Sequence, residues 1–582
     1  MRAFRISKGA KFRFRPGVKC LRLAALAEMN SSASTTLAPV LLQALLLAEP
    51  AGELALLDVR ETRWFVQRHP NLARNAPLSG LELQVGAFVP RRSTPVVLYD
   101  DYNAPDGPAQ AAVAVLARLG YTDVRTLDGG LQRWVTEGLP AIDGYGTLVK
   151  AFGDLARLHY FTPSLSVDVL RSRQREGLPT TLVDARPRAE FEFLSLPGAR
   201  NHAGTELALR RFEADDAEHV WAINCFSRTR GIIGATTLRL LGRAPDAVFV
   251  EDGVMAWGLQ GAPTVQNAMP DDELPLESPE VLRRTADELL ERFALPLADA
   301  AQLASWRADE TRTLYIFDVR PTADPAFAGT TVQQVPGGQL FMHFENLIGT
   351  HGARIVLIDD PAHRLRAAIS SFWLTQLNQA EVYVYDGALS PEQAPPAPAV
   401  AAATDAPPPL DAEALAQLRR NGAVTVIDVG ASLDYERGHL PGALYMLPAS
   451  LAPLASHAVA GRTLVFTSPD GAAARRVARD AQQRWPGSGA VFTWLQGGTG
   501  AWKASGRPLS TAFVPAQLLT PFDDDWGSVM RVFGPRRDAV WADYLAWERA
   551  LAARVLQDPS VRFRFFPTGP VNGQGPGRAA RS

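Results

Sequence analysis

Apolar runs that end in an acidic residue recur four times along the chain. They read LALLDVRE, TTLVDARP, LYIFDVRP and VTVIDVGA, and their acidic residues are Asp58, Asp184, Asp318 and Asp428. Each run is continuously apolar instead of alternating, which is typical of a strand covered on both faces in a parallel sheet. The repetition predicts four copies of one structural unit.

A second apolar run ends about 40 residues after each of these acidic residues. The four runs read PVVLYDD, HVWAINC, ARIVLIDD and RTLVFTS. An Ala-rich helical pattern and a third short strand follow, and Gly-rich turns near Asp128, Asp252, Asp386 and Gly497 close each copy. Between the first two strands we expect proline-glycine turns, at Pro197-Gly198, Pro336-Gly337 and Pro441-Gly442, with Pro77 as a weaker equivalent.

Strands that alternate with helices predict an α/β fold in which each copy is a central, mainly parallel sheet with helices on both faces. Ligands of such sheets bind beyond the carboxyl ends of the strands. Composition shifts divide the chain into a basic tail (1–29), four copies (30–145, 146–266, 277–390 and 410–510), a Pro/Ala-rich linker (391–409) and a helical C-terminal extension (511–582).

The extension contains one clear helical pattern, DAVWADYLAWERALAARVLQ. Its apolar face carries Trp541, Tyr544, Leu545, Leu551 and Val555. We expect this face to pack against the fourth copy and not to form part of a ligand site.

Composition excludes several classes of protein. The 582 residues carry a formal net charge of -2, which does not suit a nucleic-acid-binding protein. The longest apolar run, near 39–47, is shorter than the ~20 residues of a membrane-spanning helix. Two cysteines provide neither a disulfide framework nor a metal site, so we expect a soluble protein of the reducing cytoplasm without metal or cofactor. The basic residues 1–27 fit a frayed tail or an over-extended start, or else a transit-like leader.

A nucleophile follows the second strand in the second copy alone. The loop runs from Cys225 through Phe226, Ser227, Arg228, Thr229 and Arg230 into a helical pattern. Backbone N–H groups at a helix start and two arginines stabilise an anion, so we expect the Cys225 thiol to ionise more easily than a free one. The alternative is a small buried apolar residue. Cys20, in the basic tail, is interpreted as an incidental thiol.

The other copies lack this cysteine. At the equivalent position we place Asp100 in the first copy, Asp359 in the third and Thr467 in the fourth, and we expect these copies to be catalytically silent. Trp134, Trp257 and Trp502 recur near the ends of three copies and are interpreted as core anchors.

Four features together are similar to the rhodanese family: Asp-x-Arg after the first strand, Pro-Gly-Ala, a strand followed by Cys-x4-Arg, and Asp-Gly-x-x-x-Trp. The resemblance implies that Cys225 carries sulfur as a persulfide and that Phe226 to Arg230 cradle it, with Arg228 as an extra anion contact. It also implies that Asp184 and Arg186 support the loop, which we interpret as bracing. The related cysteine phosphatases need an arginine at 231, where this chain has Gly231.

The resemblance therefore implies a sulfurtransferase that moves sulfane sulfur from thiosulfate or a similar anionic donor to cyanide, a thiol or a protein acceptor. The alternative is a catalytically weak scaffold of four rhodanese folds that relays sulfur or senses redox state. We expect the first two copies to form the working unit and the last two to serve as scaffold or partner surface.

Overall fold

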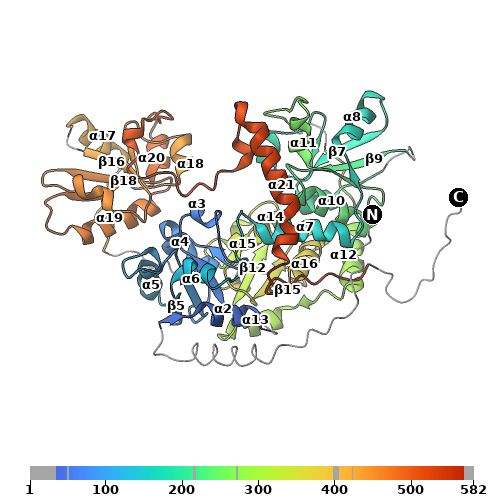
Figure 1. Cartoon of the computed structure of the whole chain (residues 1–582), viewed down its shortest axis with the longest axis horizontal. Coiled ribbons are helices and arrows are strands. Elements are labelled where there is room, and N and C mark those ends of the chain that lie inside the picture. The colour runs from blue at the N-terminus through green and yellow to red at the C-terminus, as the bar shows by residue number, and fades with distance from the viewer. Residues whose placement is uncertain are drawn as a thin grey trace.

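Four parallel sheets organise the molecule (Figure 1). The computed structural model describes residues 35–48, 52–213, 216, 218–269, 273–397, 405–422 and 424–568. We call each sheet with its helices a unit and number the units in chain order. Every strand pairing within the four sheets is parallel, as expected from the continuous apolar runs.

Unit 1 shows the arrangement that the other units repeat. Its strands are β1 (Thr36–Leu37), β2 (Ala55–Asp58), β3 (Arg74–Asn75), β4 (Val96–Tyr99) and β5 (Val124–Leu127), in the order β1-β5-β4-β2-β3. Leu57 packs with α4 (Leu78–Phe88) and α5 (Pro108–Arg118) on one face. Leu56 packs with α2 (Pro39–Leu46) and α6 (Gly130–Thr136) on the other, so helices cover both faces of the sheet.

Units 2 and 3 have the same strand order. Unit 2 contains β6 (Ser164–Leu165), β7 (Thr180–Asp184), β8 (Arg200–Asn201), β9 (Val220–Asn224) and β10 (Val248–Val250), with α8 (Val167–Arg175), α9 (Arg188–Phe193), α10 (Thr229–Leu240) and α11 (Gly253–Leu259). Unit 3 contains β11 (Leu297–Ala298), β12 (Leu314–Asp318), β13 (Val332–Gln334), β14 (Arg354–Ile358) and β15 (Glu381–Tyr385), with α12 (Pro279–Arg292), α13 (Ala300–Ala308), α14 (Gly337–Met342), α15 (Phe344–Leu347) and α16 (Leu365–Leu377).

Unit 4 keeps four of the five strands. They are β16 (Val424–Asp428), β17 (Leu444–Tyr445), β18 (Thr463–Thr467) and β19 (Val491–Trp494), in the order β17-β16-β18-β19. A single parallel bridge between Leu410 and Leu495 stands where the other units have their first strand. The helices of this unit are α17 (Ala412–Arg420), α18 (Ser432–Arg437), α19 (Ala472–Arg484) and α20 (Gly498–Ala504).

Strand register corrects one position in the sequence comparison. Asp184 pairs with Asn224, and Cys225 is the next residue, whereas Asp428 pairs with Thr467. The residue equivalent to Cys225 in unit 4 is therefore Ser468 and not Thr467. The backbone agrees, because the carbonyls of Cys225 and Ser468 accept from the corresponding N–H groups of Val254 and Thr499.

The proline turns are not all equivalent either. Pro197-Gly198 and Pro441-Gly442 precede β8 and β17, and Gly198 and Gly442 have φ values of 73° and 74°. Pro336 instead follows β13 and caps α14, as Pro77 follows β3 and caps α4. The expectation of one turn shared by all copies is therefore wrong for unit 3 and for unit 1.

The recurring tryptophans are core anchors, as expected. Each indole N–H donates to the carbonyl of a proline six residues later: Trp134 to Pro140, Trp257 to Pro263 and Trp502 to Pro508. The three rings are at most 5% exposed. These bonds hold the segment that follows each tryptophan against the core of the same unit.

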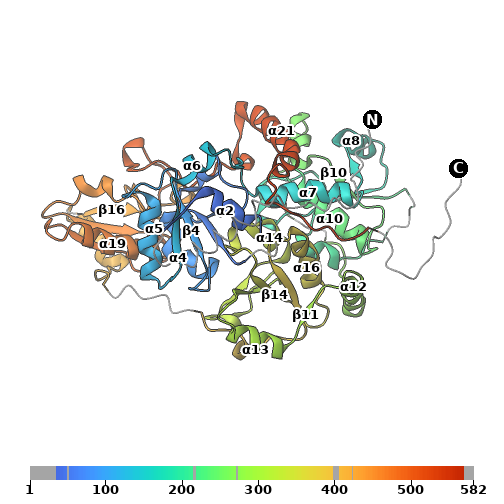
Figure 2. The same cartoon turned by 60° about the horizontal axis from the view of Figure 1, so that its bottom comes forward.

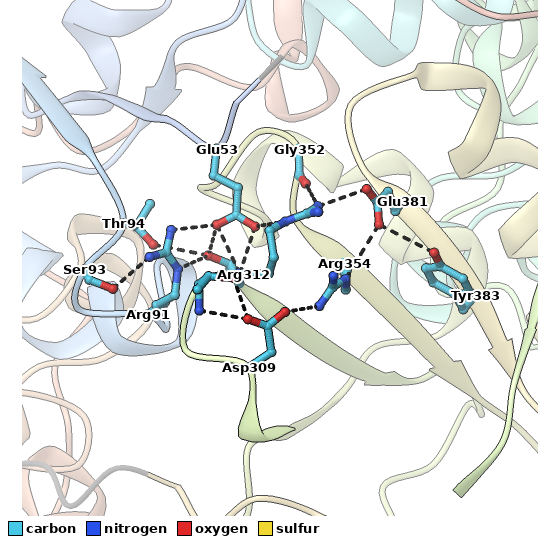
Figure 3. A network of polar contacts seen from close by, with 12 residues as sticks. Glu53, Arg91, Ser93, Thr94, Asp309, Arg312, Gly352, Arg354, Glu381 and Tyr383 are labelled. Atoms are coloured by element: carbon cyan, nitrogen blue, oxygen red, sulfur yellow. Dashed lines mark hydrogen bonds and ion pairs between the residues drawn. The ribbon is translucent and has the colours of Figure 1, made fainter. Parts of the chain in front are cut away.

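Units 1 and 3 are joined by a buried polar network (Figure 3). Glu53 accepts from Arg91 at 2.9 Å, from Arg312 at 2.9 Å and from the Thr313 hydroxyl at 2.6 Å. The Glu53 side chain is only 6% exposed. Arg312 and Thr313 precede β12, so one carboxylate from unit 1 fixes the start of this strand of unit 3.

The remaining units attach through neighbouring surfaces. Unit 2 contacts unit 3, where the Trp373 indole donates to the Thr237 hydroxyl at 2.9 Å. Unit 4 contacts unit 1, where Arg479 pairs with Glu82 at 2.8 Å. Units 4 and 2 therefore lie at opposite ends of the molecule in both views (Figures 1 and 2).

The C-terminal helix α21 (Arg537–Val555) packs differently from the sequence expectation. It lies along α7 (Thr147–His159), which precedes unit 2, and against α11, and it does not pack on unit 4 (Figure 1). Trp541 and Leu545 join the core of unit 2, and Leu551 and Val555 pack with Leu148. Unit 2 offers an apolar face that α7 and α11 leave open, and α21 fills it.

Several expectations concern residues that are wholly or partly outside the described ranges. The basic tail 1–29 and Cys20 lie outside them, as does part of the linker 391–409. Within the described part of that linker, residue 396 bridges Thr330, so this portion packs on unit 3. Among the described residues, no helix has the length and apolar character that crossing a membrane requires.

Candidate active site

Cys225 lies where β9 ends and the loop to α10 begins. It is 2% exposed, and its carbonyl accepts the Val254 N–H at 3.0 Å. Gly253, at φ 52°, comes so close that an added Cβ would lie 2.1 Å from the Cys225 oxygen. The Gly-rich turn after β10 is thus required for this loop to close.

The Cys225 side chain lines a cavity of about 160 Å³. Unit 2 supplies only part of its wall. The remaining wall comes from the segment before α7, from α7, from α14 and the residue after it, and from the C-terminal extension: Tyr145, Gly146, Lys150, Met342, His343, Trp526, Ser528, Val529, Met530, Tyr544 and Glu548. Tyr145, the last residue assigned to copy one, is the only residue of copies one and four in this lining, so most of the wall outside unit 2 comes from copy three and the C-terminal extension and not from copy one as expected.

Arg230 lies at the cavity wall, as the sequence predicts for the residue that ends the loop. Its guanidinium makes a two-point ion pair with Glu190 of α9, at 2.7 and 2.8 Å. Its positive charge lowers the pKa of the Cys225 thiol. Glu190 therefore fixes the direction of Arg230 and neutralises part of the charge that faces the sulfur.

Arg228 does not point into the cavity. It pairs with Asp154 of α7 at 2.7 Å and with Asp252 at 2.7 Å, and it is buried. The expectation that Arg228 contacts the anionic sulfur donor is therefore wrong. Two carboxylates from neighbouring elements bind it, so it connects α7, the loop and the turn after β10.

The Cys225 thiol is harder to ionise than expected. Burial raises its pKa, and this effect outweighs the opposing effects of Arg230 and of the Gly231 N–H. The negative charges of Asp184 and Glu548 raise the pKa further. The loop contains the predicted stabilising groups, but the sequence did not reveal how completely neighbouring elements exclude water from the sulfur.

The other loop residues divide between cavity and core. Ser227, Thr229 and Phe226 all contribute to the lining. The Phe226 ring also stands edge-on against Trp541 at 5.5 Å, within the core of unit 2. The Ser227 hydroxyl lies near the side chains of Tyr544 and Glu548 of α21 and lowers the pKa of each.

Asp184 and Arg186 form a buried ion pair beside the loop. Both side chains are fully buried, and they pair at 2.7 Å. Arg186 also donates to the Leu194 carbonyl, and Asp184 accepts from the Asn224 amide at 3.1 Å. Arg60 makes the corresponding bonds to Asp58 and to the Arg68 carbonyl in unit 1, which lacks the cysteine, so this pair is structural.

The loops without cysteine show what this backbone binds. In unit 1 the Asp100 carboxylate accepts the N–H groups of Tyr102, Asn103 and Ala109 at 2.5 to 2.9 Å. In unit 3 the Asp359 carboxylate accepts from Asp360 and Ala367. These loops turn backbone donors toward a negative group at the position equivalent to Cys225.

Three ionisable groups that other elements bring to the cavity were not predicted from the sequence. Lys150 and Glu548 are ionisable, half-buried and buried respectively, and His343 comes from unit 3. One signal was available for Glu548: it lies on the helical face of Trp541, Tyr544 and Leu551, where a charged residue is unusual. Lys150 and His343 stood in no recognisable pattern.

Comparison with known proteins agrees with this architecture. The family model described as Rhodanese-like domain matches residues 42–137 and 411–505, which lie in units 1 and 4. The crystal structure of a thiosulfate sulfurtransferase from Pseudomonas aeruginosa is 32% identical, with a TM-score of 0.81, over 91% of this chain and 99% of that one.

Shorter structures are similar to part of the chain only. A rhodanese from E. coli is 23% identical over 16% of this chain and 99% of that one, with a TM-score of 0.14. The Alr3790 protein from Anabaena sp. is 25% identical over 19% of this chain and 92% of that one, with a TM-score of 0.17. The search of curated proteins gives no match. Because the similarity to the Pseudomonas protein extends over nearly the whole length of both chains, this chain belongs to the rhodanese family.

Proposed function

We propose that the protein is a sulfurtransferase that carries sulfane sulfur on Cys225. One observation carries the proposal: a lone thiol lies at the wall of a cavity, at a loop whose counterparts in units 1 and 3 bind carboxylates through backbone N–H groups. A thiolate or persulfide at this position receives the same kind of stabilisation.

The chemistry is a double displacement. The Cys225 thiol loses its proton, and the sulfur attacks the outer sulfur of thiosulfate. A sulfur–sulfur bond forms to Cys225, the bond to the sulfonate sulfur breaks, and sulfite leaves with the electron pair. A thiophile then attacks the outer sulfur of the persulfide and releases the cysteine. Arg230 is the cavity-lining residue of the loop that supplies positive charge to the anionic donor.

The four units share one strand order, and we propose that all four are rhodanese-like domains, of which unit 2 is the active one. The other three hold Asp100, Asp359 and Ser468 in place of the thiol.

The cavity requires unit 3 and the C-terminal extension for its wall, and we therefore propose that both belong to the catalytic unit. Removal of residues 277–582 is then expected to abolish sulfur uptake.

The test uses intact-protein mass spectrometry. After incubation with thiosulfate and desalting, the protein should gain the mass of one sulfur atom, and cyanide should remove it as thiocyanate. Cys225→Ser should abolish both steps. Cys20→Ser is the matched control and should load normally. A Cys225→Ser variant that turns over like the unmodified protein would contradict the proposal, and a folded protein that takes up no sulfur would favour the scaffold alternative.

A further inference from the structure

Glu548 is an unusual residue for the buried face of a helix. It projects from α21 into the cavity that contains Cys225, and it is 2% exposed. Among the residues that the structure describes, neither carboxylate oxygen has a hydrogen-bond partner of normal geometry. A buried carboxylate without partners is costly, so a position that retains one points to a role beyond packing.

The neighbouring cation does not satisfy Glu548. The Lys150 ammonium donates to the Tyr145 carbonyl and lies over the rings of Tyr544 and Trp547, at 5.5 and 5.3 Å. It therefore contributes charge to the cavity without forming an ion pair within 4 Å of Glu548. The carboxylate keeps its lone pairs free for a donor that enters the cavity.

The second half of the reaction creates a need for such a group. A thiol that accepts sulfur must lose its proton before it attacks, because the thiolate is the nucleophile. The Cys225 thiolate that leaves must in turn gain a proton, because burial disfavours its charged form. A carboxylate in the same cavity can perform both transfers.

We propose that Glu548 is the catalytic base for a thiol acceptor, an inference that rests on the proposed function. Glu548 takes the proton from the acceptor thiol, whose sulfur attacks the outer sulfur of the Cys225 persulfide. The new sulfur–sulfur bond forms on the acceptor while the bond to Cys225 breaks, and Cys225 keeps the electron pair. The proton then passes from Glu548 to Cys225, so the products are an acceptor persulfide and the free thiol, with no external oxidant or reductant.

The electrostatic surroundings suit this role. Burial raises the pKa of Glu548 to about 7, so the carboxylate can accept and return a proton near neutral pH. Lys150, Ser227 and Arg228 lower this pKa, whereas Asp154 raises it. The other titratable or charged groups of the surrounding elements are Cys225 and Arg230 of the loop region, Glu190 of α9, Tyr544 of α21, and His343 after α14.

The experiment compares two acceptors after separate loading. Full-length protein and the Glu548→Gln variant are loaded with thiosulfate to completion, desalted, and mixed with either dithiothreitol or sulfite in single-turnover assays. Sulfite attacks without losing a proton at pH 8. We expect Glu548→Gln to slow transfer to dithiothreitol by about 10²-fold, within the range for a lost general base, and to slow transfer to sulfite by less than about 5-fold.

The pH profile distinguishes chemistry from packing. In the unmodified protein, the rate with dithiothreitol should show an inflection as the pH increases through about 7. In Glu548→Gln this inflection should be absent, and the rate should rise only with the ionisation of dithiothreitol itself. Asp543→Asn, an exposed change on the same helix, should alter neither rate. Equal losses with both acceptors, an unchanged thiol rate, or a variant that cannot be loaded would overturn the inference. Failure of the unmodified protein to load would instead contradict the proposed function itself.

Discussion

At the scale of single residues, aspartates at equivalent positions of units 2 and 4 lie in different environments. Asp184 is fully buried and paired with Arg186 at 2.7 Å. Asp428 occupies the same position in unit 4, where Gly430 replaces the arginine and supplies only its N–H, at 2.9 Å. Burial without a cation raises the pKa of Asp428 to about 7. Asp184 therefore has a buried cation beside it, whereas burial without a cation disfavours the charged form of Asp428.

The same substitution should act with opposite signs at these two positions. Because folding raises the pKa of Asp428 from 3.8, its carboxylate destabilises the fold increasingly as the pH rises from 3.8 to about 7. Asp428→Asn removes this penalty and should raise the free energy of unfolding above pH 7 by on the order of 3 to 5 kcal/mol, with no gain below pH 3.8.

Asp184→Asn instead leaves the buried Arg186 charge without its partner and should cost roughly 3 to 5 kcal/mol at pH 8. Thermal and urea unfolding of both variants at pH 8 and pH 5 will measure these effects. A loss of stability at pH 8 in Asp428→Asn would contradict the assignment of a disfavoured carboxylate.

At the scale of elements, α21 is the part of the chain whose role changed most between sequence and structure. Its apolar face was visible as a pattern, but the pattern did not specify which surface it covers. Trp541 packs edge-on against Phe226, next to Cys225, and the close approach of Gly258 leaves no room for a Cβ, which would lie 2.6 Å from the Trp541 ring. The helix thereby connects core packing with the position of the loop.

Trp541→Ala should destabilise the protein by about 3 to 5 kcal/mol, because it removes a large ring that is 1% exposed. It should also lower the rate of sulfur uptake, since Phe226 loses its support. Leu556→Ala, at a side chain that is 51% exposed just beyond the same helix, is the control and should change stability by less than about 0.5 kcal/mol. Unfolding and loading rates measured together will test the coupling. If Trp541→Ala lost stability without any change in loading rate, the helix would have no effect on the loop.

At the scale of the whole molecule, the site depends on contacts between units. Unit 3 supplies Met342 and His343 to the cavity, and unit 3 is fixed to unit 1 by Glu53 (Figure 3). Units without a thiol therefore position the wall around the one that has it. The four units form one connected arrangement and not a chain of independent modules.

Glu53→Ala should weaken this arrangement. It leaves Arg91, Arg312 and the Thr313 N–H without their shared acceptor, and loss of one partner of a buried ion pair costs about 3 to 5 kcal/mol. Glu381→Ala removes another partner of Arg312, but the Glu381 side chain is 47% exposed, so this control should cost less than about 1 kcal/mol. Calorimetry should show that units 1 and 3 unfold at a lower temperature in Glu53→Ala only. Equal effects of the two variants would show that Glu53 does not join the units.

Much of the fold was predictable because it is local and repeated. Continuous apolar runs determined the central strands, and Gly-rich turns marked the end of each copy. The assignment of Thr467 failed because a sequence count cannot fix strand register within one residue, whereas the pairing of Asp428 with Thr467 can. Arg228 was misassigned because its partners, Asp154 and Asp252, lie 74 and 24 residues away.

The sequence by itself determined the four α/β units, the single cysteine at a strand end and the Asp184–Arg186 brace, because each depends on neighbouring residues or on a pattern that recurs. Tertiary structure alone decided which side chains surround Cys225. Lys150, His343 and Glu548 come from three separate elements, and only the packing of α7, unit 3 and α21 against unit 2 brings them together. The same packing excludes water, and that exclusion reverses the expected direction of the Cys225 pKa.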